Sequence, residues 1–566
     1  MQFKQSLIVL ALLSTITACG GGSSDSGTVQ PPNGGGGTTT PTVGTTGVIT
    51  GFGSVIVNGV HYSTTSTTVS TDDKDSGAET DLAVGMVVDV SGTLSADGST
   101  GTASSIKYSA HVEGPISLID LATKQITVLG QVIDFDDLTV FEGITADTLK
   151  INDRVEISGY YKNPGQFYAS RIELDSKPAQ LLKVYGAVAE LNTVAQTFKV
   201  GPQLVDYSKA RLDDFGSQQL ANGQTVKVKG STVDAASKAL VATEIDLKTK
   251  PTTNPDKLRT EGTVANVVAD TSFELNGVKL LLTANTAFEN GTKAELINGA
   301  LVKVQASNST DGWKADKVVF IKAVVSKVEG KVTAVNTTDK TFTVGTETYL
   351  VTPQTVLKDD SSRKVRFFEL SSLAVNDYVE VVGFKNPQGS LVALKVEREN
   401  GASADGYIEL KGLPTEVAAD SFTLFGKKVT VDSNTVYLNG RRVLTQQAFF
   451  TLLKTTTVVE VKATAAGNDL LATRLKIESA GSNDGAVETE FKGSVSEKGA
   501  DFIVVGGKKV LLTANTKLRI GKKRDYTVEG FLTDVKVADR VEVEGTVDAA
   551  TSNINARSVS VEREND

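Results

Sequence analysis

The sequence predicts an all-β protein: a tandem array of about seven small OB-like β-barrels, each of five to six strands, after a disordered Gly/Ser/Thr/Pro tether. One observation is a strand phrase of alternating apolar residues that ends in a small residue, such as Arg-Val-Glu-Ile-Ser-Gly at 154–159. A second is its recurrence, because such phrases end at residues 92, 159, 230, 306, 383, 463 and 545. Their spacing of roughly 70 to 80 residues is typical of small domains rather than of solenoid repeats. A third is the small residue at each strand end, which favours a closed sheet without unpaired edges.

The chain begins with a positive charge at Lys4, an apolar run at 7–13 and the sequence Ile-Thr-Ala-Cys at 16–19. The apolar run is too short to span a bilayer as a helix and is typical of a cleaved signal peptide. This start resembles the lipobox of bacterial lipoproteins, which implies a signal peptide over 1–18 and lipidation of Cys19. Because Gly20 follows Cys19, analogy with lipoprotein sorting implies an outer-membrane lipoprotein facing the periplasm or the cell surface. Cys19 is the single cysteine of the chain, so no thiol remains for a disulfide or a metal site.

Residues 19–46 consist almost wholly of Gly, Ser, Thr and Pro, and we expect them to form the disordered tether. We expect seven barrels to follow, at residues 47–111, 112–176, 181–249, 258–323, 327–400, 405–479 and 487–563. The connections between copies are short, which predicts a moderately stiff rod in which neighbouring barrels share interfaces.

The seventh copy shows the order of elements most clearly. Two β-rich runs flank Gly506-Gly507, which predicts a tight hairpin, because both central positions tolerate positive φ. Asn58-Gly59, Asn276-Gly277 and Phe425-Gly426 have the same place in other copies. Next come a threonine, an irregular stretch that is helix-like at 367–373 and 446–453, the return strand, and a closing Ala-x-x-Ile or similar motif. The threonines are Thr139, Thr286, Thr355, Thr435 and Thr516. Three strands, an insertion and two strands make the order of an OB-like barrel, and they are too few for an immunoglobulin-like sandwich.

The opening Gly-Val-Ile-Thr-Gly-Phe-Gly-Ser-Val-Ile-Val-Asn-Gly-Val-His-Tyr at 47–62, together with 84–88 and Thr102-Ala103, carries a family resemblance. It resembles an uncharacterised family of bacterial multi-repeat envelope lipoproteins, classed as a domain of unknown function. The resemblance implies the architecture and the location, and it implies no reaction and no functional residue.

The inventory of reactive residues does not predict an enzyme, a cofactor or a metal site. The only histidines, His61 and His111, belong to the first copy, and spacing assembles neither a metal site nor a nucleophile–base pair around them. The acidic loop at 72–77 lacks the glycine and the glutamate of an EF-hand, so we expect a solvated loop. Carboxylates on the return strands alternate with other residues and are expected to be solvated: Glu156, Glu380, Glu460 and Glu542.

Two patterns suggest ligand binding instead. Aromatic residues gather at hairpins that lie on the usual ligand rim of an OB-like barrel: Tyr160, Tyr161, Phe167, Tyr168, Trp313 and Phe384. They are expected either to stack on sugar rings or to cover a neighbouring barrel, and the second is favoured. Basic loops occupy matched positions in copies five to seven: Arg363 to Arg366, Arg441-Arg442, and Lys522, Lys523 and Arg524. They are expected to form a stripe for acidic polysaccharide or lipid headgroups, or to be separate solvated loops, which is the favoured alternative.

We therefore expect a lipid-anchored, non-catalytic cell-envelope protein that acts as a spacer and interaction scaffold. The alternative is a glycan- or acidic-polysaccharide-binding protein that uses the aromatic and basic residues above, and the third possibility is an unrecognised envelope enzyme. The expected partners are the membrane and envelope polysaccharides or proteins. Nucleic acid is not expected, because the net charge is -9 and the location lies outside the cytoplasm.

Overall fold

The computed structural model describes residues 40–562, except 73, 122, 178–180, 249–254, 322–325, 387, 402–406, 441, 478–486, 522, 525 and 549–550. The expected signal peptide, the lipidation of Cys19 and residues 19–39 of the expected tether lie outside this part of the chain. None of the helices in the described part has the length and apolar character needed to cross a membrane.

Barrel 2 shows the topology that the copies share. Its strands are β8 (Val112–Asp120), β9 (Gln125–Val128), β10 (Gln131–Asp134), β11 (Val140–Glu142), β12 (Arg154–Asn163) and β13 (Gln166–Leu174), with a 3-10 turn, η2 (Ala146–Thr148), before β12. β8 pairs antiparallel with β9 and β12, β9 with β10, and β12 with β13, and β10 closes the sheet by pairing parallel with β13. The short β11 also pairs parallel with β13. This is the five-stranded order of an OB-like barrel with one added strand, so the predicted fold is confirmed.

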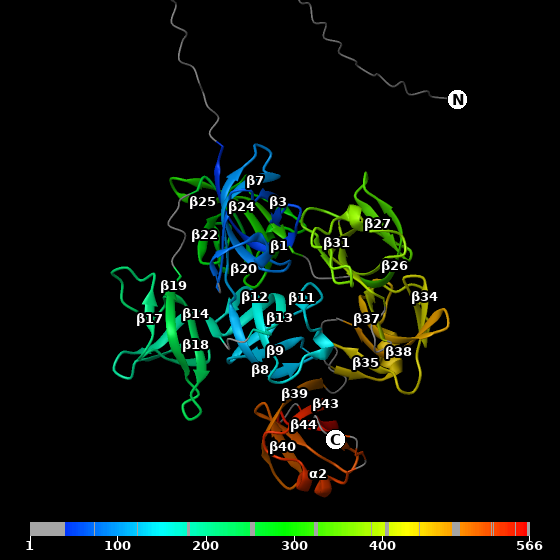
Figure 1. Cartoon of the computed structure of the whole chain (residues 1–566). Coiled ribbons are helices and arrows are strands. Elements are labelled where there is room, and N and C mark those ends of the chain that lie inside the picture. Colours follow the sequence, from blue (N-terminus) through cyan, green and yellow to red (C-terminus); the bar gives the residue numbers. More distant parts are fainter. Residues whose placement is uncertain are drawn as a thin grey trace, which may run out of the picture. The chain divides into compact units, whose positions relative to one another are not determined.

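The other six copies repeat this order (Figure 1). Barrel 1 comprises β1 (Thr42–Gly51), β2 (Val55–Val57), β3 (Val60–Ser63), β4 (Thr68–Thr71), β5 (Lys74–Gly77), η1 (Glu79–Asp81), β6 (Val87–Leu94) and β7 (Thr100–Tyr108). Barrel 3 comprises β14 (Leu182–Asn192), β15 (Thr197–Val200), β16 (Gln203–Asp206), β17 (Arg211–Asp213), β18 (Thr225–Val233) and β19 (Leu240–Leu247). Barrel 4 comprises β20 (Lys257–Val268), β21 (Ser272–Leu275), β22 (Val278–Leu281), β23 (Ala287–Glu289), η3 (Lys293–Glu295), β24 (Leu301–Ser309) and β25 (Gly312–Phe320).

Barrel 5 comprises β26 (Ser326–Asn336), β27 (Thr341–Val344), β28 (Glu347–Leu350), β29 (Val356–Asp359), η4 (Leu370–Ser372), β30 (Tyr378–Lys385) and β31 (Leu391–Glu399). Barrel 6 comprises β32 (Tyr407–Gly412), β33 (Ser421–Leu424), β34 (Lys427–Thr430), β35 (Val436–Asn439), β36 (Arg442–Leu444), α1 (Gln446–Leu452), β37 (Val459–Ala466) and β38 (Asp469–Ile477). Barrel 7 comprises β39 (Val487–Lys498), β40 (Phe502–Val505), β41 (Lys508–Leu511), β42 (Lys517–Ile520), α2 (Val528–Asp534), β43 (Arg540–Val547) and β44 (Ile554–Glu562).

The predicted tether is too long at its end, because β1 already begins at Thr42. Its first residues pair antiparallel with β6 and parallel with β20 of barrel 4. Two partner strands satisfy the backbone of this Thr- and Gly-containing segment, which composition alone would leave disordered.

The predicted hairpin turns are confirmed. Asn58, Asn276, Phe425 and Gly506 have φ between 50° and 55°, and the glycine that follows each has φ between 73° and 75°. Positive φ at both central positions is the geometry of a type I′ turn, whose twist matches that of the two strands it joins.

The small residue that ends each repeated sequence motif lies inside the return strand, where a β-bulge forms. In all seven barrels the register of the last hairpin shifts at this residue, for example between Ser158 and Gly159. A Cβ on Gly159 would lie 1.9 Å from the Tyr168 carbonyl oxygen, so the bulge brings two backbones unusually close.

The motif threonine closes the same corner. Thr139 Oγ1 donates a hydrogen bond of 2.8 Å to the carbonyl of Ala169, the residue after Tyr168 and the first of the closing Ala-x-x-Ile motif. Equivalent bonds of 2.7 to 2.9 Å join Thr67 to Ala103, Thr286 to Ala315, Thr355 to Ala393, Thr435 to Ala472 and Thr516 to Ala556. Barrel 3 has Ala210 in place of the threonine, so this bond cannot form there.

Short helices form where the insertion carries a capping threonine. The hydroxyl of Thr445 accepts a hydrogen bond from the Ala448 amide at the start of α1, where the sequence predicts a helix-like stretch. The hydroxyl of Thr527 likewise accepts from the Gly530 amide at the start of α2, which the sequence analysis did not predict. Two adjacent apolar residues of each helix are buried in the barrel: Phe449 and Phe450 in α1, and Phe531 and Leu532 in α2.

Contacts between barrels do not follow only the order of the chain. Consecutive barrels 2 and 3 share an apolar core, as do barrels 5 and 6. In addition, β1 of barrel 1 pairs with β20 of barrel 4, and β8 of barrel 2 pairs with β39 of barrel 7. Strands of barrels that are several copies apart therefore also pair, which the sequence analysis did not predict.

Candidate functional site

Charged residues on outward-facing strands form a buried network between barrels 1, 2 and 3. Lys183 of β14 is fully buried, and its Nζ lies 2.7 Å from Glu113 Oε2 of β8 and 3.4 Å from Asp72 Oδ2 of barrel 1. Lys227 of β18 contacts the same aspartate and donates a bond of 2.9 Å to Ser109 Oγ. Burial raises the pKa of Asp72, but the two lysines outweigh it and lower that pKa to about 2. Asp72, at the start of the acidic loop, thus belongs to an inter-barrel ion pair, whereas Lys74, Asp75 and Ser76 of the same loop are exposed, as expected.

A second network joins barrel 2 to barrels 5 and 6. Asp137 lies 2.9 Å from Lys124 within its own barrel and 4.0 Å from Lys411 of barrel 6. Burial raises the pKa of Asp137, while Lys124, Lys327 and Lys411 together lower it well below its usual range. From barrel 5, Lys358 Nζ donates a bond of 2.6 Å to the Phe141 carbonyl.

The return-strand carboxylates belong to these networks more than the sequence suggested. Glu156 is buried with its side chain 7% exposed, and it accepts hydrogen bonds from Tyr108 and Lys177. Glu380 contacts Lys327, and Glu460 contacts Lys411. The prediction of a solvated position is wrong for Glu156, because its buried carboxylate accepts hydrogen bonds from Tyr108 of barrel 1 and from Lys177.

The aromatic residues do not form an exposed rim. Phe167 is fully buried in the core of its barrel, with Tyr161 packed edge-on at 5.5 Å. Tyr168 is partly buried and donates a hydrogen bond of 2.9 Å to Asp136, and Trp313 packs on the core of barrel 4. Tyr160 and Phe384 are buried, and together with Tyr168 they line a cleft between four barrels. Tyr160, Tyr168 and Phe384 thus lie between barrels, whereas Phe167 and Trp313 pack within their own barrels.

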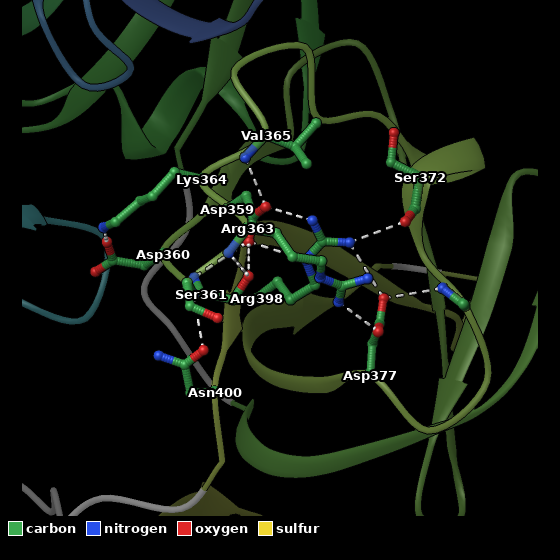
Figure 2. Close-up of polar contacts among 12 residues, drawn as sticks. Asp359, Asp360, Ser361, Arg363, Lys364, Val365, Ser372, Asp377, Arg398 and Asn400 are labelled. Carbon is green, nitrogen blue, oxygen red and sulfur yellow. Dashed lines mark hydrogen bonds and ion pairs between the residues drawn. The ribbon is translucent and has the colours of Figure 1, made fainter.

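The basic loop of barrel 5 is held by acidic residues of its own barrel, as Figure 2 shows. Arg363 donates a bond of 2.6 Å to Asp377 Oδ1, and the buried Arg398 contacts Asp377 and both oxygens of Asp359. Burial raises the pKa of Asp359, but hydrogen bonds from Arg398 and Ser361 outweigh it and lower that pKa. This cluster braces the loop that carries the predicted cations.

Arg366 of the same loop docks on barrel 1. Its guanidinium stacks 3.9 Å from the Phe52 ring centre, and it donates hydrogen bonds to the carbonyls of Leu82 and Glu79. Arg363 and Arg366 therefore both have partners within the chain, although the Arg363 side chain is half exposed.

The remaining basic residues differ in exposure. Arg442 is partly buried on β36, whereas Lys523 and Arg524 are exposed on barrel 7. Lys523 lies 3.8 Å from Asp534 and 4.2 Å from the Tyr526 ring centre. Arg441 and Lys522 lie outside the described residues. The stripe of three basic loops therefore stays a prediction.

The two histidines lie in unrelated surroundings. His61 is exposed, and its Nδ1 lies 3.3 Å from Ser54 Oγ, but no carboxylate of the described part of the chain is found to orient the ring. His111 is partly buried beside Phe167 and Tyr185, and the desolvation of its ring lowers its pKa to about 4.

One group of carboxylates in the described residues is close enough to share a cation: Asp213, Glu244 and Asp246. Arg211 already contacts Asp213 and Glu244 at 2.6 Å, and Lys229 also pairs with this group. The group is thus neutralised by basic side chains of the same barrel.

The sequence analysis missed Lys183 and Glu113. A lysine inside an otherwise apolar strand, Leu-Leu-Lys-Val-Tyr at 181–185, is the signal that could have marked a buried partner.

The fold and these faces define a class of protein: a tandem array of OB-like barrels whose outward strand faces bind one another. Seven segments match the profile of one family, described as a domain of unknown function (DUF5666), at residues 46–107, 113–173, 185–246, 261–319, 329–397, 411–476 and 492–560. The chain belongs to this family, as the resemblance of the first copy implied.

Among solved structures, the chain is similar to Drosophila Unr CSD456, with 15% identity over 41% of this chain and 99% of that one, and a TM-score of 0.11. No curated protein matched the sequence.

Proposed function

We propose that this protein is a lipid-anchored, non-catalytic envelope protein whose barrels form an interaction scaffold. The observation that carries the scaffold role is the use of the barrels' outer faces. The networks around Lys183 and Asp137 and the strand pairing of β1 with β20 show barrel faces binding other barrels through charge and backbone bonds. A face of this kind is suited to bind further barrel-like or strand-presenting proteins.

The anchor rests on the lipobox-like start at Cys19. It is tested by feeding cells an alkyne-tagged fatty acid and comparing the wild type with Cys19→Ser. The wild type should carry the label and sediment with membranes, and the variant should do neither. An unlabelled wild type would show that the attachment is not by acylation.

The non-catalytic role is tested by incubating the purified chain with isolated envelope polysaccharide and peptidoglycan. No fragment should be released at any protein concentration. Release that scales with protein concentration and persists after repurification would show that the protein is an enzyme rather than a scaffold.

Glycan binding through the rim is less well supported. Phe167, Tyr160 and Phe384 are buried, and Arg363 and Arg366 have partners within the chain. Stacking on a sugar needs exposed aromatic faces, which these residues do not offer.

A further inference from the structure

The ion pair between Lys183 and Glu113 holds an amine and a carboxyl group in contact away from water. The two residues lie directly opposite each other where β14 of barrel 3 pairs antiparallel with β8 of barrel 2. Lys183 Nζ lies 2.7 Å from Glu113 Oε2, and the two side chains are 0% and 1% exposed. The neighbouring residue pair, Val184 and Val112, is fully buried in the core that the two barrels share. Strand register and packing therefore fix the two polar groups in one geometry.

A second carboxyl group, that of Asp72 in barrel 1, also lies near this amine. Its Oδ2 is 3.4 Å from Lys183 Nζ and accepts a hydrogen bond of 2.8 Å from the Ala110 amide. Burial raises the pKa of Asp72, but Lys183 and Lys227 outweigh it and lower that pKa to about 2. Burial also raises the pKa of Glu113, and there Lys183 does not outweigh it, so the pKa is about 7. Asp72 therefore stays charged, whereas Glu113 reaches its neutral form near neutral pH.

We propose that Lys183 and Glu113 condense to an amide bond that joins barrels 2 and 3 covalently. The Lys183 ammonium first gives one proton to the Glu113 carboxylate, which leaves a neutral amine beside a neutral acid. The amine nitrogen attacks Glu113 Cδ, and a second nitrogen proton passes by way of Asp72 to the departing hydroxyl, which leaves as water. The third proton stays on the amide nitrogen. One N–C bond forms and one C–O bond breaks, so the reaction needs no oxidant, reductant or further reactant.

The buried position favours this reaction in two ways. An amide carries no charge, so its formation removes the cost of keeping an ammonium and a carboxylate out of water. The fixed contact also replaces a chance encounter between amine and acid, and effective concentrations in such arrangements reach about 10⁵ M or more. The ion pair is the precursor state. The reaction consumes its own groups once, and it depends neither on the proposed anchor nor on the scaffold role.

Intact-mass measurement of the unfolded, full-length Cys19→Ser chain tests the bond without an attached acyl group. The mass should be lower than the sequence mass by one water molecule, and a protease digest should contain a branched peptide that joins Lys183 to Glu113. Lys183→Arg in the same chain keeps the positive charge but removes the reacting amine, so this variant should have the full sequence mass. Full mass in the Cys19→Ser chain after prolonged incubation at pH 7 would overturn the proposal, and so would a mass loss without that branched peptide.

Two further measurements test the roles of Asp72 and of burial. Asp72→Asn removes the group that passes the proton and should slow formation of the linked mass after refolding by about a hundredfold. Formation at an unchanged rate, or a branch from Lys183 to Asp72, would overturn the role of Asp72. The matched control is the pair of Lys327 and Glu380, whose atoms lie 3.2 Å apart but whose side chains are 13% and 21% exposed. It should give no branched peptide, and a branch there would overturn the role given to burial.

Discussion

The inside and the outside of the barrels vary in different ways from copy to copy. Inside, the hairpin formed by the last two strands has the same feature in all seven barrels. A β-bulge lies at a glycine or alanine that pairs with an alanine of the last strand. Outside, the charge of the third residue of the repeated strand motif differs between copies. It is negative in five copies and positive in two: Asp89, Glu156, Lys227, Lys303, Glu380, Glu460 and Glu542. The comparison teaches that the interior fixes the fold of each copy, while the outer charges decide which copies bind each other.

The largest expected effect on stability comes from removing the buried ion pairs of Lys183, which lie on the outer face of its barrel. Lys183→Ala leaves Glu113 and Asp72 without their closest shared cation, and loss of one partner of a buried ion pair costs about 3 to 5 kcal/mol. Hydrogen exchange should rise in β8 and β14, where the two barrels pair.

Lys199→Ala is the matched control, because its pair with Glu190 is exposed and should contribute at most about 1 kcal/mol. If both variants exchange alike, the buried network does not hold barrels 2 and 3 together.

The next effect is a pH dependence at the same junction. The pKa of His111 is about 4 in the folded chain and 6.5 when the side chain is free in water. Between these values the unfolded chain binds a proton that the folded chain does not, so stability falls as the pH drops from 6.5 to 4, by about 3 kcal/mol. His111→Phe should flatten this part of the stability profile in denaturant titrations. An identical acid slope in both proteins would show that other groups cause the loss.

The sequence predicted the inside of the barrels well and the outside poorly. Gly506-Gly507 acts through local backbone geometry, so its role can be inferred from nearby residues. The recurring Thr139 position was also visible, but its bond to the Ala169 carbonyl, 30 residues later, was not predicted. Lys183 and Asp72 lie 111 positions apart in the numbering and meet only because two barrels dock. The same holds for Tyr160, whose place in a cleft depends on three other barrels.

A smaller effect is expected from the bulge itself. Gly159→Ala places a Cβ against the Tyr168 carbonyl, and the required backbone shift should cost about 1 to 3 kcal/mol, measured as faster exchange in β12 and β13. Barrels 4 and 6 have Ala306 and Ala463 at this position, so their backbones already accommodate a methyl group. Ala306→Gly should therefore change exchange in barrel 4 by less than Gly159→Ala does in barrel 2.

The smallest effect comes from the motif threonine. Thr355→Val keeps the shape but removes the bond of 2.7 Å to the Ala393 carbonyl, at a cost of about 1 kcal/mol, read from hydrogen exchange in β29 and β31. Thr338→Val, at an exposed turn of the same barrel, should leave that exchange unchanged. Barrel 3 already has an alanine in place of this threonine, so Ala210→Thr there should slow exchange in β19 if the bond is a general closing device. If Ala210→Thr has no effect while Thr355→Val does, barrel 3 closes by its own packing, and the interior varies between copies as the outer faces do.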